Sequence, residues 1–256
     1  MAATLFFDAT DYQPGTRHPP HQHDCLHLSL VLRGSVAEAV SGVTEYAGAL
    51  SIVAKDAGVV HADRFGPTGA KLARLTLPSG TIGGLIDDPR RAPTWQWKHR
   101  PDIAKSFLRL VRRASVGVSA FDTDDPDLLD ILALLTARPV SSPRGSPPGW
   151  LEQTMADLRQ SWHPGLTVRD VARVAGVHPV YLARSVRRWY GTGVGEELRN
   201  LRFRRAVAAI AGSKATVSNV AHETGFSDEA HLCRSFQQSL GISPRRYRTL
   251  LRGSSR

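Results

Sequence analysis

Cysteine, methionine and long apolar runs are scarce in this sequence. Its 256 residues include two methionines and two cysteines, Cys25 and Cys233. Two cysteines in separate predicted domains form no disulfide framework, which fits a reducing compartment. No apolar run approaches the roughly 18 residues that a membrane-spanning helix needs, and no basic-then-apolar signal opens the chain. These absences argue against membrane proteins and disulfide-rich secreted proteins, and we expect a cytoplasmic protein.

Acidic residues are sparse in the C-terminal part of the chain. Residues 150–256 contain 17 Lys and Arg against 8 Asp and Glu, a net charge of +9. Residues 1–149 contain 16 against 15, a net charge of +1. A basic domain beside a near-neutral one is typical of nucleic-acid binding, since the positive charge is concentrated in one domain. The alternative is that these arginines lie on solvated helix faces.

The most informative stretch runs from Val217 to Arg248 and predicts a helix, a glycine turn and a second helix, followed by a Ser-Pro helix start and a basic tail. The same skeleton occurs about fifty residues earlier, which indicates a duplicated unit. The earlier copy contains Thr167, Val168, Val171, Ala172, Gly176, Leu182, Arg184, Val186 and Gly191, and these align with Thr216, Val217, Val220, Ala221, Gly225, Leu232, Arg234, Phe236 and Gly241.

Each part of this skeleton has a physical reason. Val168, Val171 and Ala172 are spaced to share one helical face, which we expect to pack on the second helix. Gly176 and Gly225 stand where a sharp turn requires a positive φ. A short helix held across a turn from another helix is a common means of reaching the DNA major groove.

Both copies resemble the twin helix-turn-helix domain of AraC/XylS-type transcription regulators. The resemblance covers about residues 150–252, and its C-terminal signature is met by Val217, Val220, Ala221, Gly225, Phe226, Ser227, Arg234, Phe236, Gly241, Ser243, Pro244, Tyr247 and Arg248. It implies an all-α DNA-binding domain over 150–256, with helix-turn-helix motifs at about 166–190 and 216–239. Between them, Glu196–Ala211 is predicted to be a connecting helix. A rigid helix would fix the two recognition helices relative to each other, so that they can enter successive major-groove segments about 34 Å apart.

The family's pattern also implies which side chains meet DNA. Base-reading positions fall on Val180, Ala183 and Arg184 in the first recognition helix and on Glu229, Ala230, Cys233 and Arg234 in the second. Arginine pairs with guanine, glutamate accepts from cytosine, and small apolar groups touch the thymine methyl. Candidates for backbone contact are Tyr181, Arg187, Arg188, His231, Arg245, Arg246 and Arg248. Phosphate binding, ion pairs within the fold or a solvated surface are the alternatives for these side chains.

The N-terminal half is predicted to be antiparallel β structure. Short apolar runs at His27–Leu32, Val36–Val40, Ala49–Ala54 and Lys71–Leu77 are separated by Gly, Asp and Pro, which is typical of a sandwich or barrel. Gly34 is expected to end the first strand. The layout resembles a cupin barrel over about residues 5–80, and we assign 1–85 to this domain. The whole chain is therefore expected to be a multidomain α+β protein.

Histidines mark a candidate site in this domain. His21, His23 and His27 share strand parity, so they point to one side of an extended chain. His61 follows the strand predicted at Ala49–Ala54, and the resemblance to cupins implies that such histidines surround a metal. In this sequence His27 replaces the acidic ligand, and the usual proline of the second cupin motif is absent.

Two occupants of this site stay open. Neutral imidazoles can hold zinc or iron, with His18 or Cys25 assisting. Alternatively the same histidines line a metal-free pocket for a small-molecule effector, as the AraC resemblance implies.

Residues 86–140 are predicted to be helical, at Pro101–Arg113 and Pro126–Arg138. The second helix is leucine-rich, so it is either packed within its domain or shared across a homodimer, and the AraC resemblance implies the dimer. Ser141–Gly149, with the sequence SSPRGSPPG, is predicted to be a linker that lets the two domains fold separately.

These features predict a sequence-specific regulator, activator or repressor, that binds double-stranded promoter DNA and responds to an effector through the N-terminal domain. Contact with RNA polymerase is a further expectation, and no membrane association or catalysis is expected. The competing hypothesis is a metal-dependent cupin enzyme fused to a DNA-binding domain, and it depends on the histidines alone.

Overall fold

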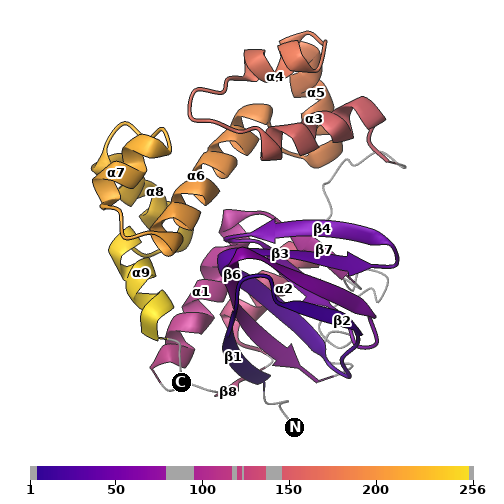
Figure 1. Ribbon diagram of the computed structural model, residues 1–256, viewed down its shortest axis with the longest axis vertical. Helices are drawn as coiled ribbons and strands as arrows, with labels where there is room; N and C mark the ends of the chain where they lie inside the picture. The colour runs from indigo at the N-terminus through magenta and orange to yellow at the C-terminus, as the bar shows by residue number, and fades with distance from the viewer. Residues whose placement is uncertain (1–4, 79–94, 117–119, 123, 137–145, 254–256) are drawn as a thin grey trace.

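The computed structural model describes residues 5–78, 95–116, 120–122, 124–136 and 146–253. An antiparallel sheet lies beside two helices, and a C-terminal group of helices follows (Figure 1). The strands are β1 Leu5–Tyr12, β2 Arg17–His21, β3 Leu26–Val40, β4 Val43–Gly48, β5 Ile52–Lys55, β6 His61–Leu77, β7 Trp95–Lys98 and β8 Ala120–Phe121. The helices are α1 Pro101–Ser115, α2 Pro126–Thr136, α3 Gly149–Gln160, α4 Val168–Val174, α5 Pro179–Tyr190, α6 Val194–Gly212, α7 Val217–Glu223, α8 Glu229–Leu240 and α9 Pro244–Gly253. This arrangement confirms the predicted α+β class.

The two longest strands, β3 and β6, pair with each other and organise the sheet. The strand order is β7-β5-β3-β6-β1-β8, while β4 pairs with β3 and β2 pairs with β6. One face, including Leu30 and Leu75, packs in the same core as α1 and α2. Residues of the other face, including Val31, Val53 and Leu72, form a second, smaller core. The sheet therefore buries apolar side chains on both faces.

Gly34 does not end a strand, contrary to the sequence prediction. It lies inside β3 at φ +75°, where the register against β6 shifts. A Cβ atom at Gly34 would lie 1.9 Å from the carbonyl oxygen of Gly69 on β6. The absence of a side chain lets the paired strands bend closely past each other. One continuous strand therefore replaces the two predicted at 27–32 and 36–40.

Other strand boundaries also differ from the prediction. β6 begins at His61 rather than at Lys71, and β5 begins at Ile52 rather than at Ala49. Five further strands, β1, β2, β4, β7 and β8, were not expected from the sequence. β2 and β4 each pair with a single neighbour and are largely exposed, so they lack the apolar runs on which the prediction depended.

The leucine-rich helix α2 packs within its own domain. Leu128, Ile131, Leu132 and Leu135 are each at most 4% exposed and share a core with α1 and the sheet. Leu129 is 40% exposed. Most of the apolar stripe is thus already buried inside the chain, and a homodimer through α2 stays a prediction.

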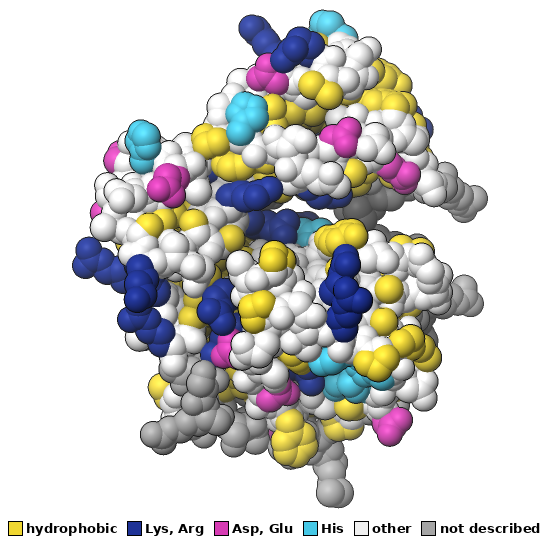
Figure 2. All heavy atoms as spheres, viewed as in Figure 1, with side chains coloured by type: hydrophobic (Ala, Val, Ile, Leu, Met, Phe, Trp, Pro, Cys, Tyr) yellow, Lys and Arg dark blue, Asp and Glu magenta, His cyan; other side chains and the backbone are white. Residues whose placement is uncertain are grey.

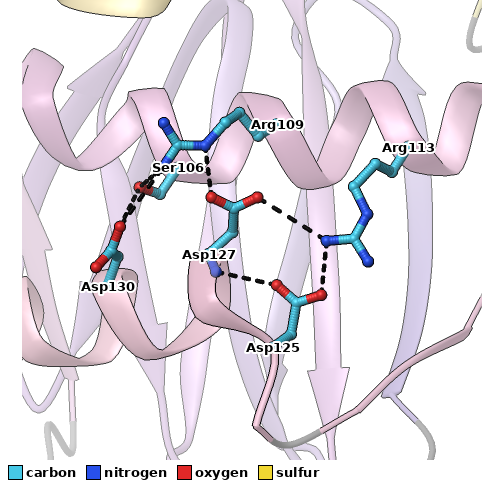
Figure 3. A network of polar contacts seen from close by, with 6 residues as sticks. All are labelled: Ser106, Arg109, Arg113, Asp125, Asp127 and Asp130. Carbon is cyan, nitrogen blue, oxygen red and sulfur yellow. Dashed lines mark hydrogen bonds and ion pairs between the residues drawn. The ribbon is translucent and has the colours of Figure 1, made fainter.

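Ion pairs join α1 to α2 at the edge of this core (Figure 3). Arg109 pairs with Asp127 and, at 3.4 Å, with Asp130. Arg113 pairs with Asp125, whose side chain also accepts from the backbone N–H of Asp127 at the start of α2. The carboxylates lie near the N-terminus of α2 and face arginines of α1, so the network fixes how the two helices lie together.

The C-terminal helices are divided between two cores. Val194, Leu198 and Leu201, in the first half of α6, pack with α3, α4 and α5. Phe203 and Val207, in its second half, pack with α7, α8 and α9 in the core that also contains the sheet and α1. The second helix-turn-helix unit therefore shares a core with the sheet and α1, and independent folding of the two domains stays a prediction.

Polar contacts reinforce this packing between the sheet and the C-terminal helices. The buried Tyr247 hydroxyl on α9 donates to the carbonyl oxygen of Leu32 on β3 at 2.6 Å. On α6, the Arg204 guanidinium donates to the carbonyl oxygen of Ala49 at 3.2 Å and to Ser51 Oγ at 2.8 Å. Figure 1 shows α6 running from the first unit toward the sheet and the second unit.

Two further expectations concern the linker and the cysteines. Residues 141–145 of the predicted linker lie outside the described residues, and α3 begins at Gly149. Cys25 and Cys233 are both free thiols, as expected. Within the described ranges no helix combines the length and apolar character needed to cross a membrane.

Candidate nucleic-acid interface and sensor cavity

A cavity of about 170 Å³ lies in the N-terminal domain, against the smaller core of the sheet. Its apolar wall includes Trp97, Val53 and the stacked rings of Tyr12 and Phe65, whose centroids are 3.9 Å apart. The polar lining is provided by His18, His21, His23, His61, Ser29, Glu38, Lys55, Asp63 and Arg74. Polar groups from several strands converge on this small space, which makes it a candidate site for a small ligand or an ion.

Three of the four predicted histidines, His21, His23 and His61, line this cavity, although they do not lie along one strand. His21 ends β2, His23 lies in the connection after it, and His27 belongs to β3, so the expected strand parity is wrong. The His21 and His61 ring centroids are 4.2 Å apart, and those of His23 and His61 are 5.2 Å apart. One ligand nitrogen from each of His21, His23 and His61 lies within 4.8 Å of the others.

His27, His18 and Cys25 lie beside this cluster. The His27 ring is tilted against the His23 ring, at a centroid distance of 4.3 Å, and its Nε2 atom contacts Cys25 Sγ at 3.3 Å. His18 Nδ1 faces the carboxylate of Asp63 at 3.6 Å. The same carboxylate oxygen is 3.9 Å from His61 Nε2.

Glu38 is the most thoroughly bonded acid of the cavity. Its side chain is 1% exposed and accepts from Lys55 Nζ, from Trp95 Nε1 at 2.6 Å and from Trp97 Nε1 at 2.8 Å. Burial of a charged carboxylate is costly because it loses its water, and hydrogen bonds from these three donors offset that cost. Glu38 therefore ties β3 to β5 and β7 around the cavity.

The rings of His23, His27 and His61 are held neutral. Burial, with positive charges nearby, lowers the pKa of His23 to about 4 and the pKa of His27 to about 3. Burial and the charge of Lys55 also lower the pKa of His61. At neutral pH the rings therefore keep a lone pair, which an ion or a hydrogen-bond donor can use.

The first helix-turn-helix unit consists of α4, a turn and α5. Thr167 and Asp170 form a capping box at the start of α4. Gly176 has φ +67°, as its place in the turn predicts. His178 Nδ1 accepts from the backbone N–H of Val180, and Pro179 occupies the first turn of α5. Both helices of this unit therefore begin at caps that the local sequence provides, and Gly176 makes the turn between them.

The second unit, α7 and α8, repeats this construction. Thr216 caps α7, Gly225 has φ +76°, and the Asp228 side chain accepts from the backbone N–H of His231 at the start of α8. A Cβ atom at Gly225 would lie 2.9 Å from Pro164 Cβ, so the turn also packs closely. The predicted turn glycines are confirmed, and Asp228 caps α8.

On α5, the predicted contact side chains lie at the surface. Leu182 and Val186 are buried, and the exposed residues are Val180, Tyr181, Ala183, Arg184, Arg187 and Arg188. The Tyr181 ring stacks on Trp150 of α3 at 5.6 Å, which leaves 54% of the residue exposed. The face opposite the core is therefore basic.

On α8 and α9, the candidates are more varied. Ala230, Arg234, Arg245 and Arg246 are exposed, Glu229 lies 3.9 Å from the Arg245 guanidinium, and Cys233 is partly buried against the core. Arg248 instead donates to the carbonyl oxygens of Ile210 and Ala215, so its role is within the fold. Figure 2 shows basic side chains on the C-terminal lobes and in the hollow between the upper lobe and the sheet.

Comparison with known proteins agrees with this geometry. Residues 171–249 match a family described as a helix-turn-helix domain. The HTH-type transcriptional regulator GlxA of Rhizobium meliloti is 35% identical over 215 residues, 68% of this chain and 66% of that protein. A putative AraC-like transcription regulator of Streptomyces lividans is 33% identical over 92 residues, 36% of this chain and 29% of that protein.

The C-terminal part of this chain is an AraC-type helix-turn-helix domain. The chain spans just under two thirds of GlxA and about a third or less of the other curated relatives it matches. Among solved structures, ToxT of Vibrio cholerae aligns with 96% of this chain and 99% of its own, at 10% identity and a TM-score of 0.39. The C-terminal domain of AraT of Geobacillus stearothermophilus aligns with 41% of this chain and 88% of its own, at 21% identity and a TM-score of 0.37.

Sequence reasoning found the AraC-type domain but missed much of the cavity. Glu38, Lys55 and Trp97 were not singled out, although they form one buried network. Strand alternation alone does not reveal them, because β3 bends at Gly34 and β7 was not predicted. The available signal was that Glu38 and Lys55 are charged residues within or next to predicted apolar strands, which indicates a polar site inside the domain.

Proposed function

We propose that this protein is a transcription regulator that binds double-stranded promoter DNA with both recognition helices, α5 and α8. The observation that carries the proposal is the duplication: each unit has a threonine cap on its first helix and a positive-φ glycine in its turn, and each presents an exposed, arginine-bearing helix face. Such a helix fits the major groove. The named relatives are regulators, which supports the same function.

The connecting helix supports joint binding by the two units. α6 has 19 residues, which corresponds to about 28 Å of α-helix. Its halves are packed into the two different units, so it holds them apart as a rigid spacer. This length is close to the roughly 34 Å between successive major-groove segments on one face of DNA.

The sheet supports an effector response, because the strands around the cavity also hold the AraC-type domain. β5 contributes Val53 and Lys55 to the cavity, and Ser51 just before it accepts from Arg204 of α6. β3 contributes Glu38 to the cavity and presents its Leu32 carbonyl to α9. We propose that a ligand in the cavity changes the strand positions and, through these contacts, how α6 and α9 are held.

The test is DNA binding by the full chain to fragments selected from random double-stranded DNA. Arg184→Ala and Arg234→Ala remove side chains proposed to read guanine, and each is expected to weaken binding to the selected site about 10- to 100-fold. Affinity is expected to fall with salt, with a slope of log K near −0.9 per phosphate contacted. Fluorescence anisotropy at several salt concentrations measures both effects.

Arg17→Ala is the matched control, since Arg17 is an exposed arginine on β2. It is expected to keep wild-type affinity. If both recognition-helix variants bind the selected site as the control does, the proposed base contacts are wrong. If the selection enriches no sequence, and the affinity for random double-stranded DNA does not change with salt, the proposed function itself fails.

The remaining proposed contacts are Val180, Tyr181, Ala183, Arg187, Arg188, Glu229, Ala230, Cys233, Arg245 and Arg246. Among them Cys233 is the least accessible, because it is partly buried against the core. A small-molecule effector, a homodimer and contact with RNA polymerase stay predictions, as does the choice between activation and repression. The enzyme alternative is favoured only by the histidine cluster, and turnover of a substrate by the purified protein would support it.

A further inference from the structure

The rings of His21 and His61 are oriented in the same way by backbone carbonyls. His21 Nδ1 lies 2.8 Å from the carbonyl oxygen of Pro19, and His61 Nδ1 lies 2.9 Å from that of Val59. A carbonyl oxygen accepts only, so each Nδ1 carries a hydrogen, and the uncharged form of each ring has its lone pair on Nε2. This is how proteins fix the tautomer of a metal-binding histidine.

The lone pair of His61 has no hydrogen-bond donor among the described residues. Its side chain is 1% exposed, and Nε2 is a buried polar atom with no hydrogen-bond partner there. A buried nitrogen without a hydrogen-bond partner destabilises the fold, so a bound ion would satisfy an otherwise unused lone pair. His21 and His23 place their ligand nitrogens within 4.8 Å of this atom.

We propose that His21, His23 and His61 bind one late first-row divalent metal ion in the cavity. Nitrogens about 2.0–2.1 Å from one tetrahedral ion lie about 3.4 Å apart, so nitrogens that now lie within 4.8 Å of one another must close by at most about 1.4 Å. A set of imidazoles selects zinc, nickel, cobalt, copper or iron(II) over calcium and magnesium, which prefer oxygen.

The neighbouring acids and His27 take different roles. Glu38 is already held by Lys55 and two tryptophans, which leaves it a fixed part of the wall. Asp63, 3.9 Å from His61 Nε2, is the carboxylate placed to join the ion or a water bound to it. His27 engages Cys25 and stays outside the ligand set.

Metal binding stands on this geometry alone, while a regulatory role for the metal rests on the proposed function. The wall that carries His61 and Asp63, β6, is paired along β3, whose Leu32 carbonyl accepts from Tyr247 of the AraC-type domain. An ion that draws the three histidines together would therefore act on strands that hold the DNA-binding helices.

The experiment uses the untagged full chain after chelation and dialysis, with zinc, nickel and cobalt as separate probes. Isothermal titration is expected to show one ion per chain, cobalt is expected to give visible absorption bands of nitrogen coordination, and zinc is expected to raise the melting temperature. His23→Gln and His61→Gln are each expected to weaken binding by at least 100-fold.

Two variants serve as controls. His222→Gln alters an exposed histidine on α7, and His27→Gln alters the neighbour outside the proposed set; both are expected to bind the ion as the wild type does. Circular dichroism of each variant establishes that it is folded. Absence of saturable binding to the wild type, or unchanged binding in a folded His23→Gln variant, would overturn the proposal.

DNA binding measured on the same metal-free and metal-loaded samples separates the two proposals. Protein that binds selected DNA but no ion keeps the regulator proposal and loses the metal site. Protein that binds the ion but no DNA keeps the metal site and overturns the regulator proposal. Different DNA affinities with and without the ion would establish the metal as a regulator of this chain.

Discussion

His99 is predicted to make the protein sensitive to acid. Burial, together with the charges of Arg204 and Arg159, lowers the pKa of His99 from 6.5 to about 3. Ser51 Oγ accepts from the backbone N–H of Gly48 and from Arg204, so both of its lone pairs are used and its own hydrogen goes to His99 Nδ1 at 2.9 Å. Protonation of His99 would place a hydrogen on Nδ1, where it faces the Ser51 Oγ atom, which has no lone pair left to accept it.

The sign and size of the effect follow from linkage. The folded-state pKa is lowered, so unfolded chains bind more protons below pH 6.5 and stability is lost as the pH falls through that value. At pH 5 the gap to the unfolded pKa is about 1.5 units, each worth about 1.36 kcal/mol, so His99 costs up to about 2 kcal/mol. Near pH 3 the loss levels off.

The assay is urea unfolding at pH 7 and pH 5 of the wild type and of His99→Asn. The asparagine Oδ1 atom can accept from Ser51 as Nδ1 does, but the side chain does not titrate. The variant is expected to lose about 2 kcal/mol less stability than the wild type between the two pH values. His222→Asn, on an exposed face of α7, is expected to behave as the wild type. Equal pH dependence in wild type and His99→Asn would refute the reasoning.

Two substitutions test the packing of the chain by urea unfolding. Tyr247→Phe leaves the Leu32 carbonyl without its buried donor, and we expect the free energy of unfolding to fall by about 1–3 kcal/mol; no change would mean that another donor replaces the hydroxyl. Gly34→Ala combines a positive φ with a clash against the Gly69 carbonyl, so it is expected to cost well over 2 kcal/mol. Gly42→Ala, with φ +82° and open space around it, is the matched control and should cost only about 1–2 kcal/mol; equal losses would contradict the steric argument.

The AraC-type domain was predictable because its signals are local. Gly225 fixes a turn, Asp228 fixes a helix start, and the spacing of Leu232 and Phe236 fixes the buried face. Each feature acts within about four residues of the chain. Duplication of the unit then added an independent check.

The N-terminal domain was less predictable because its determinants act over long sequence separations. Gly34 was predicted to end a strand, but in the structure it is a bend within β3. The reason is the close approach of Gly69, which lies 35 residues away in the sequence. The contact of Arg204 with Ser51 joins residues 153 positions apart and has no local signature. The histidines were found from their residue type, while their true arrangement depends on a turn between two strands.

The position of Arg204 on α6 gives the helix the properties of a lever arm. Arg204 is bound to the sheet, and the start of α6 at Val194 lies ten residues, about 15 Å, before it. A rotation of about 10° at this fulcrum would displace the start of α6, and the first unit with it, by about 2.6 Å. Such a shift is nearly a full hydrogen-bond length, so a small rotation of α6 would be enough to take α5 out of register with the bases that it is proposed to read.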